Sequence, residues 1–231
     1  MNYLFDPMPT FSIPVQGEER QFPVRRIFCV GRNYADHIKE MGFQPEREPP
    51  FFFTKPVDAL VADGSTIPYP PLTENLHHEA ELVIAIGKSG ADIPASEGLD
   101  YVYGYASGND LTRRDLQFAL RDRGRPWDWS KGFDASAVVG TITPMPGKEF
   151  PGEARIQLTV NDESRQDATI DTLIWKIPEI IAELSASVTI MPGDLVFTGT
   201  PAGVGPLVPG DVCTVRIDGL APVTVRIGPR K

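Results

Sequence analysis

The chain contains 23 prolines, which are spread along its whole length and are not gathered in one linker. Because proline ends helices and both proline and glycine mark turns, this distribution divides the chain into many short elements. Eight segments have the apolar or alternating pattern of strands: residues 26–30, 51–54, 81–86, 101–109, 156–160, 194–198, 212–217 and 222–227. The sequence therefore predicts a strand-rich α+β fold, without a repeat of fixed period.

Three helices are expected, at residues 35–41, 112–123 and 171–184. Thr112 or Asp110 is a candidate cap for the second helix, and Pro178 predicts a kink or a later start in the third. The opening residues resemble a hairpin that turns at residues 16–19. We therefore expect an N-terminal hairpin appendage over residues 1–23 and a single catalytic domain over residues 24–231.

Bulk properties narrow the class of protein. With 231 residues and 41% hydrophobic content, the chain can bury one large core. The net charge of −9, with scattered acidic residues, argues against nucleic acid and anionic membranes as partners. No signal peptide is visible, and no apolar stretch approaches the ~20 residues of a membrane span. Cys29 and Cys213 lie in apolar runs and are expected to be small buried hydrophobes. A soluble cytoplasmic protein is predicted.

Two glutamates stand one residue apart at the head of an apolar run, and a third carboxylate ends the next predicted strand. On a strand, Glu79 and Glu81 point to the same face, and Asp110 is the third member of the group. Like charges this close need a compensating cation, and carboxylate oxygens suit Mg²⁺ or Mn²⁺ better than zinc. Three carboxylates also leave positions of an octahedral shell for water and substrate. The alternative is a frayed, solvated strand end.

Further polar residues occur in three separate segments. His37 and Glu40 are three residues apart on a predicted helix, a spacing that lets a carboxylate orient an imidazole base. Arg114 and Gln117 share a helix face, and Lys131 follows in an expected loop; such groups bind an anionic substrate and stabilise developing negative charge. A glycine-rich turn at residues 198–205 offers backbone N–H groups. Solvated helix surfaces are the structural alternative for the first two segments.

In this order and spacing, the segments resemble the fumarylacetoacetate hydrolase family from about residue 24 to the C-terminus. The resemblance is carried by residues 31–37, 53–56, 77–81, 103–105, 109–110 and 198–205. It implies a mixed β-sandwich roll with a few flanking helices, and a homodimer. The larger members have a long N-terminal domain that supplies a further aspartate ligand. This chain lacks that domain and is most similar to the short acylpyruvate hydrolase branch, in particular the bacterial fumarylpyruvate hydrolases of aromatic compound degradation.

The resemblance also implies a reaction and a role for each site residue. The reaction is hydrolysis of a carbon–carbon bond in a β-diketo acid, here fumarylpyruvate to fumarate and pyruvate, with one Mg²⁺ or Mn²⁺ per chain. The metal ligands fall on Glu79, Glu81 and Asp110, and the pair that activates water falls on His37 and Glu40. The family's remaining site residues fall on Arg114, Gln117, Lys131 and the substrate-contacting Thr200.

Several alternatives remain at this point. The same site would serve an oxaloacetate decarboxylase or a hydroxymuconate-type isomerase or decarboxylase. A further alternative is a protein without catalytic activity, namely a metal- or ligand-binding module. The distal carboxylate of fumarylpyruvate calls for a cation, for which the candidates are Arg32, Lys55, Arg113 and Arg121. Gly42 and the proline-rich residues 44–50 flank the His37 helix, so a closing lid is expected there.

Overall fold

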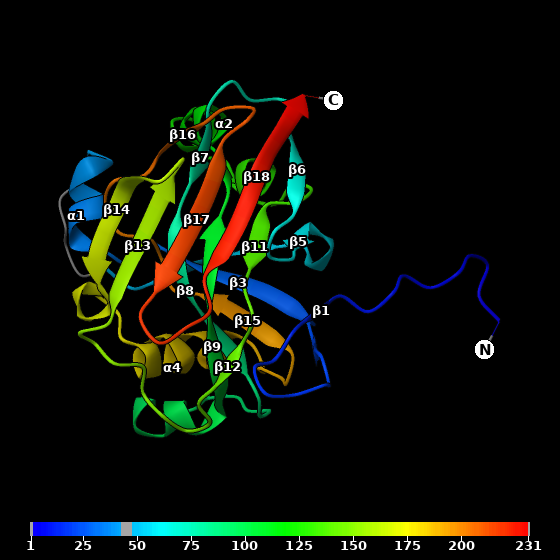
Figure 1. Ribbon diagram of the computed structural model, residues 1–231. Helices are drawn as coiled ribbons and strands as arrows, with labels where there is room; N and C mark the ends of the chain where they lie inside the picture. The colour runs from blue at the N-terminus through cyan, green and yellow to red at the C-terminus, as the bar shows by residue number, and fades with distance from the viewer. Residues whose placement is uncertain (1, 43–47, 231) are drawn as a thin grey trace.

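The computed structural model describes residues 2–42 and 48–230, and most of its elements are strands (Figure 1). A sheet of eight strands has the order β4 (Phe51–Lys55), β3 (Arg26–Gly31), β15 (Asp194–Phe197), β8 (Ala80–Ile86), β9 (Val102–Asp110), β11 (Ala137–Val139) and β5 (Leu60–Val61), with β12 (Thr143–Pro144) also paired to β9. A five-stranded sheet has the order β14 (Glu163–Thr169), β13 (Arg155–Val160), β17 (Val212–Ile217), β18 (Val223–Arg230) and β6 (Thr66–Tyr69). The fold class predicted from the sequence is confirmed.

Strand β8 lies inside the larger sheet and separates two hydrophobic cores. Leu82, Ile84 and Ile86 point into the larger core, which also takes apolar residues of β13, β17 and β18. Val83 and Ala85 point into a second core on the opposite face. This alternation follows from the two-residue period of a strand. It also places residues 79 and 81 on the face of the second core, where apolar residues give way to charged ones.

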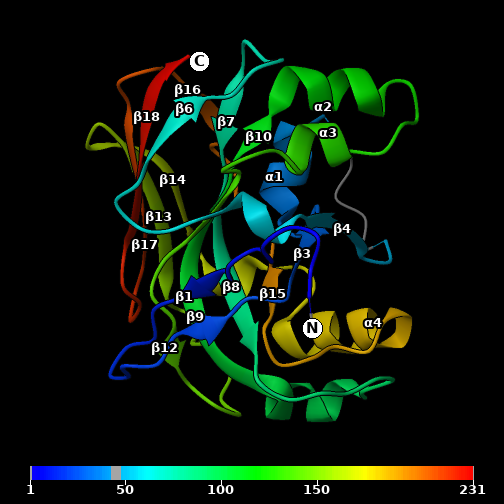
Figure 2. The same cartoon turned by 90° about the vertical axis from the view of Figure 1, so that its right-hand side faces the viewer.

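Helices lie on one side of the molecule, with the five-stranded sheet on the other (Figure 2). They are α1 (Ala35–Glu40), α2 (Arg114–Arg121), α3 (Asp128–Lys131) and α4 (Ile177–Ser187), with 3₁₀ turns at Val57–Ala59, Ala95–Tyr101 and Ile170–Thr172. A small sheet of β10 (Thr112–Arg113), β7 (Leu76–His78) and β16 (Gly205–Leu207) lies beside α2. No helix of the described residues is long and apolar enough to cross a membrane.

Helix α4 begins at Ile177, which confirms the later start expected from Pro178, because the proline lies in the first turn, where its missing N–H removes no helical hydrogen bond. Two other local expectations need correction. Thr112 does not cap α2, because it belongs to β10 and pairs with His77. Lys131 lies on the one-turn helix α3 and not in a loop.

The N-terminal hairpin consists of β1 (Ser12–Ile13) paired with β2 (Phe22–Pro23). Ile13 and Phe22 are buried in the second core against the larger sheet. Residues 2–11 extend away from the body of the molecule (Figure 1), with Leu4 and Phe5 strongly exposed. The division into an appendage and a catalytic domain at residue 23 stays a prediction.

Candidate active site

Three buried carboxylates gather where β8 begins and β9 ends. Antiparallel pairing of these strands sets Ala80 opposite Asn109, and the Asp110 N–H donates to the Glu79 carbonyl at 2.9 Å. Glu79, Glu81 and Asp110 are each at most 4% exposed, and one oxygen of each lies within 4.8 Å of the others. The register of the two strands therefore brings together the three side chains that the sequence analysis grouped.

Two cations neutralise part of this cluster from the side of α2 and α3. Lys131 Nζ lies 2.8 Å from Glu79 Oε2, 2.7 Å from Asp110 Oδ2 and 2.7 Å from the Thr112 hydroxyl. Arg114 forms an ion pair with the other oxygen of Glu79. Burial alone would raise the pKa of Glu79, but Lys131 and Arg114 hold it well below its usual value. Burial alone would lower the pKa of Lys131, but Asp110 and Glu79 raise it.

Lys55 is a third cation of the cluster. Its Nζ lies 2.7 Å from Asp110 Oδ1 and donates to the carbonyl oxygens of Leu111, at 3.1 Å, and Lys131. The side chain is completely buried. The Lys55 ammonium group is therefore occupied by Asp110 and two carbonyl oxygens. It is excluded as the cation for a distal substrate carboxylate, for which it was one of four candidates.

The donor set fits a hard divalent cation. Glu81 Oε2 accepts the Gly199 N–H at 2.7 Å, whereas burial, Asp110 and Glu79 raise the pKa of Glu81 well above its usual value. Asp110 Oδ1 is buried and accepts no hydrogen bond from the described residues, although Lys55 lies beside it. A cation bound here would favour ionised Glu81 and would share the carboxylate of Asp110 with Lys55 and Lys131. Such all-oxygen sites suit Mg²⁺ and Mn²⁺.

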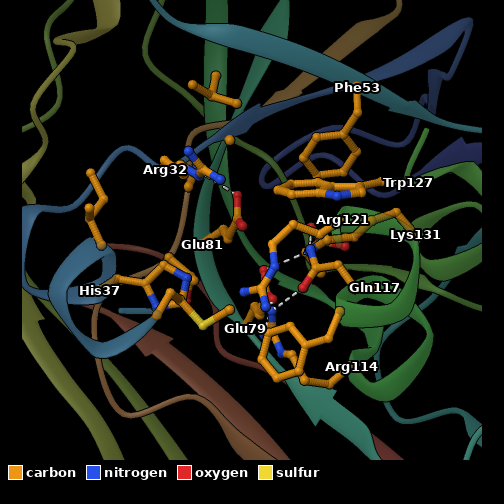
Figure 3. Close-up of a pocket in the computed structure, with 18 residues that line it drawn as sticks. Arg32, His37, Phe53, Glu79, Glu81, Arg114, Gln117, Arg121, Trp127 and Lys131 are labelled. Atoms are coloured by element: carbon orange, nitrogen blue, oxygen red, sulfur yellow. Dashed lines mark hydrogen bonds and ion pairs between the residues drawn. The ribbon is translucent and has the colours of Figure 1, made fainter. Parts of the chain in front are cut away.

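Helix α1 carries the predicted base, His37. It lies on the side of the cavity opposite Gln117 of α2 (Figure 3). His37 Nδ1 lies 3.1 Å from Glu40 Oε2, and Gly203 N–H donates to Glu40 Oε1 at 3.0 Å. Burial alone would raise the pKa of Glu40, but the hydrogen bonds from His37 and Gly203 lower it. Part of the expected lid, residues 43–47, lies outside the described residues, and the lid stays a prediction.

Helix α2 presents Arg114 and Gln117 to the cavity from successive turns. Arg114 donates to Gln117 Oε1, so the amide nitrogen of Gln117 is the end that remains for a ligand. Arg114 Nε also donates to His77 Nδ1 at 3.3 Å. Burial and Arg114 lower the pKa of His77 to about 4. His77 is therefore a neutral neighbour that supports Arg114.

Aromatic and basic side chains complete the lining of the cavity. Phe53 and Trp127 meet edge to face in its wall, with ring centroids 6.0 Å apart (Figure 3). Arg32 and Arg121 also line the cavity. Arg113 does not line the cavity. Its side chain donates to the Trp129 carbonyl at 3.0 Å and lies over the ring of Phe133.

The sequence analysis missed two residues that hold the site together. Thr112 donates to Glu79 Oε1 at 3.0 Å and accepts from Lys131, although its position suggested only a helix cap. Gln166 donates to the hydroxyl of Thr200 at 2.8 Å. Thr200 itself is 3% exposed and lines the cavity, next to Gly199. A polar residue in an exposed strand gives no sequence signal for such a contact.

Known proteins with similar sequences and structures agree in fold and in family. The model of the fumarylacetoacetate hydrolase C-terminal domain matches residues 26–228. The chain is 46% identical over 182 residues to a fumarylpyruvate hydrolase of Ralstonia sp., covering 79% of this chain and 94% of that protein. It is 41% identical over 203 residues to a mitochondrial oxaloacetate tautomerase of Mus musculus, covering 88% and 91%.

A solved structure extends this agreement to three dimensions. The fumarylpyruvate hydrolase of Pseudomonas aeruginosa, in complex with Mn²⁺ and pyruvate, superposes with a TM-score of 0.95 at 50% sequence identity. The alignment covers 99% of this chain and 100% of that one. These similarities show that the chain belongs to the fumarylacetoacetate hydrolase family, and its strand order and buried acidic cluster agree with this.

Proposed function

We propose that this chain hydrolyses the carbon–carbon bond of an acylpyruvate and releases a carboxylic acid and pyruvate, with fumarylpyruvate as the preferred substrate. The observation that carries the proposal is one cavity lined by a buried carboxylate cluster, by His37, which is hydrogen-bonded to Glu40, and by the donors Arg114 and Gln117. The identities of 46% and 50% to two fumarylpyruvate hydrolases support the same activity. This reaction would belong to the degradation of aromatic compounds.

One divalent cation, Mg²⁺ or Mn²⁺, held by Glu79, Glu81 and Asp110, would supply a Lewis acid for the carboxylate and adjacent keto oxygens of the substrate. The three carboxylates, when ionised, balance the three cations Lys55, Arg114 and Lys131. A bound divalent cation therefore leaves two positive charges in a buried region. The carboxylate of the substrate that lies next to the metal offsets one of them.

His37 is the proposed base. Its Nδ1 donates to Glu40, which leaves the Nε2 lone pair to take a proton from water. Hydroxide then adds to the distal carbonyl carbon, and the bond to the methylene carbon breaks. The proton held by His37 returns to that carbon, which completes pyruvate. Glu40 fixes the imidazole tautomer and stabilises its protonated form.

Developing charge on the attacked carbonyl oxygen needs hydrogen-bond donors. Gln117 supplies its amide N–H, because Arg114 occupies the other end of that amide. The guanidinium of Arg114 lies next to it and adds positive charge. Lys131 has three N–H groups and three protein acceptors, so its first role is to hold Glu79 and Asp110 in place. Arg32 and Arg121 are the remaining candidates for the distal carboxylate of the substrate.

A second candidate is proton transfer on oxaloacetate. The 41% identity to an oxaloacetate tautomerase favours it, and a decarboxylase or hydroxymuconate-type isomerase would use the same donors. In these reactions His37 would move a proton between carbon and oxygen without an attacking water. The pairing of His37 with Glu40 beside the acidic cluster supports hydrolysis as the main activity, because it provides for activation of water.

The test is a comparison of kcat/KM for fumarylpyruvate, acetylpyruvate and oxaloacetate, each with Mn²⁺ and with a chelator. We expect metal-dependent cleavage, with fumarylpyruvate favoured over acetylpyruvate by about tenfold or more for one charge-assisted hydrogen bond. Equal values for the two acylpyruvates would remove the preference for a distal charge. Turnover of oxaloacetate alone would favour the second candidate, and metal binding without turnover would favour a non-catalytic module.

The family resemblance also supports a homodimer, and we propose a cytoplasmic location. Light scattering on the purified chain would measure its mass against the 25.4 kDa of one chain. A mass of one chain at micromolar concentration would contradict the dimer. Fractionation of the source cells would test the location.

A further inference from the structure

Gln166 lies where two sheets and the glycine-rich turn of residues 198–205 meet. It is 1% exposed, whereas its neighbours Arg165 and Asp167 on β14 are exposed. Leu158 of β13 pairs with Gln166, but the next residue, Thr159, pairs with Ser164, so Arg165 is left over as a bulge. A bulge redirects the side chains that follow it. The bulge at Arg165 directs the Gln166 amide into the interior, although most of the edge strand β14 is exposed to solvent.

The orientation of the Gln166 amide is fixed at both ends. Its Oε1 accepts the backbone N–H of Ala80, at 3.0 Å, and an N–H can only donate. Its Nε2 donates to the Pro201 carbonyl, at 2.8 Å, and a carbonyl can only accept. The reversed amide would place an oxygen against an oxygen and a nitrogen against an N–H. No such reversal satisfies both partners, so the oxygen faces β8 and the nitrogen faces the turn.

This orientation determines the direction of the hydrogen bond to Thr200. Gln166 Nε2 lies 2.8 Å from Thr200 Oγ1, and because the amide nitrogen donates, the hydroxyl oxygen accepts. The hydroxyl hydrogen of Thr200 then finds no acceptor among the residues that the structure describes. Thr200 lines the cavity beside Glu81 and Gly199. Its hydroxyl is thus kept as a donor for a ligand.

The same amide sets the tautomer of a buried histidine. His78 Nδ1 lies 3.1 Å from Gln166 Oε1, which is an acceptor, so Nδ1 carries the proton. The other ring nitrogen, Nε2, is buried and has no hydrogen-bond partner within residues 2–42 and 48–230. Gln166 therefore uses all four of its hydrogen-bonding positions, on His78, Ala80, Thr200 and Pro201.

The turn is seated closely against this strand. Gly203 has φ +96°, and a Cβ at that position would lie 2.2 Å from the Arg165 carbonyl oxygen. Only glycine permits both the left-handed backbone and this approach. The bulge of β14 and the turn therefore pack closely against each other, and the hydrogen bond of Gln166 to Thr200 lies in this contact.

We propose that Gln166 is a positioning residue that holds the Thr200 hydroxyl as a hydrogen-bond donor toward the carboxylate of an α-keto acid in the cavity. The identity of the ligand rests on the proposed function, whereas the direction of the network rests on Ala80 and Pro201. Binding of pyruvate to the Mn²⁺-loaded protein tests it without turnover. Thr200→Val and Gln166→Met should each weaken pyruvate by about tenfold or more, as expected for loss of a hydrogen bond to a charged group.

The double variant separates positioning from general damage. Gln166→Met combined with Thr200→Val should bind pyruvate no more weakly than Thr200→Val alone, because the amide acts through that hydroxyl. Thr200→Ser should keep most of the affinity. Gln157→Met, the same change on the neighbouring strand β13, should have no effect. Unchanged pyruvate affinity in Gln166→Met, or full additivity in the double variant, would overturn the proposal.

A measurement on the unmodified protein covers the case in which Gln166→Met does not fold. Long-range ¹H–¹⁵N NMR should show His78 with its proton on Nδ1 at a pH where the ring is neutral. A proton on Nε2 would reverse the network and overturn the proposal. Failure of the wild-type protein to bind pyruvate would instead count against the proposed function, and the NMR result would still decide the direction of the network.

Discussion

The two sides of the cavity differ in how firmly they hold their charges. On one side, the buried carboxylates of Glu79 and Asp110 are paired with cations from β4, α2 and α3, and Glu81 beside them accepts the Gly199 N–H. On the other side, His37 and Glu40 lie on a six-residue helix without a side-chain N-cap, and the Glu40 side chain is 33% exposed. We call these the braced side and the helix side.

This difference corresponds to different chemical tasks. Charges that must hold a metal in one geometry are stabilised when neighbouring cations fix each oxygen, as on the braced side. A base needs a fixed orientation toward its water, and His37, which is buried, is oriented by the single, partly exposed carboxylate of Glu40. The contact between Glu40 and Gly203 ties the helix side to the turn that also bears Thr200. The two sides therefore meet at the glycine-rich turn.

The largest effect is expected from removal of a carboxylate from the braced side. Glu81→Ala should abolish metal-dependent activity and weaken Mn²⁺ by more than about a hundredfold, since even residues behind metal ligands contribute 10–100-fold. Calorimetric titration with Mn²⁺ measures the affinity directly. Glu163→Ala, at an exposed glutamate on β14, is the control. Retained Mn²⁺ affinity in Glu81→Ala would contradict the assignment of this residue as a ligand.

Removal of a cation from the braced side should lower stability. Lys131→Met leaves Glu79 and Asp110 without their shared partner, and breaking a buried ion pair in this way costs about 3–5 kcal/mol in the free energy of unfolding. Added Mn²⁺ should restore part of the loss, because it supplies positive charge to the same carboxylates. Urea denaturation with and without Mn²⁺ measures both effects.

The helix side provides the control for that experiment. Lys39 forms an exposed ion pair with Asp36 on α1, so Lys39→Met should change the free energy of unfolding by less than about 1 kcal/mol. Equal losses for Lys131→Met and Lys39→Met would remove the distinction between the two sides.

Loss of the base should reduce turnover without affecting the metal. His37→Ala should lower kcat for acylpyruvate cleavage by about a hundredfold or more, because proton transfer from water loses its acceptor. The Mn²⁺ affinity should stay that of the wild type, since the base lies on the helix side. Steady-state kinetics and the same calorimetric titration give both values. Undiminished hydrolysis in this variant would contradict the proposed role of His37 as the base.

Metal binding should depend on pH through Glu81. Its pKa is raised in the folded, metal-free protein by burial and by Asp110 and Glu79, so the protonated form contributes stability at low pH that is lost as pH rises through the folded pKa. A metal must displace that proton. Mn²⁺ affinity should therefore increase with pH, by up to about tenfold per unit below the pKa of Glu81. A flat calorimetric profile over the acidic range would contradict this.

The smallest effect concerns the distal end of the cavity. Arg121 lines the cavity from the end of α2 and stacks on Phe118. Arg121→Leu should lower kcat/KM for fumarylpyruvate by about tenfold and leave acetylpyruvate unchanged, because only the former has a second carboxylate. Arg123→Leu, at an exposed residue just beyond the helix, is the control. Equal losses on both substrates would exclude Arg121 as the distal cation and leave Arg32.

Local patterns in the sequence contained the positions of β3, β4, β8, β9, β13, β15, β17 and β18, though not of β14, and the grouping of the acidic residues. The alternation around β8 placed Glu79 and Glu81 on one face, and the end of β9 placed Asp110 within reach. The spacing of His37 and Glu40 is that of a hydrogen-bonded pair on a helix. These features are short-range consequences of strand and helix periods, so they can be predicted from residues that are close in the chain.

By itself, the sequence determined the strand-rich fold class, the acidic group and the family resemblance. Only the tertiary structure decided that Lys55 is a buried counter-ion of Asp110, that Arg113 lies outside the cavity, and that Gln166 reaches Thr200. The contacts of Gln166 and Lys55 join residues that are 34 and 55 positions apart, and the place of Arg113 depends on the direction of one side chain. They are set by strand register, by a bulge in β14 and by the packing of one sheet on another, none of which a local pattern contains.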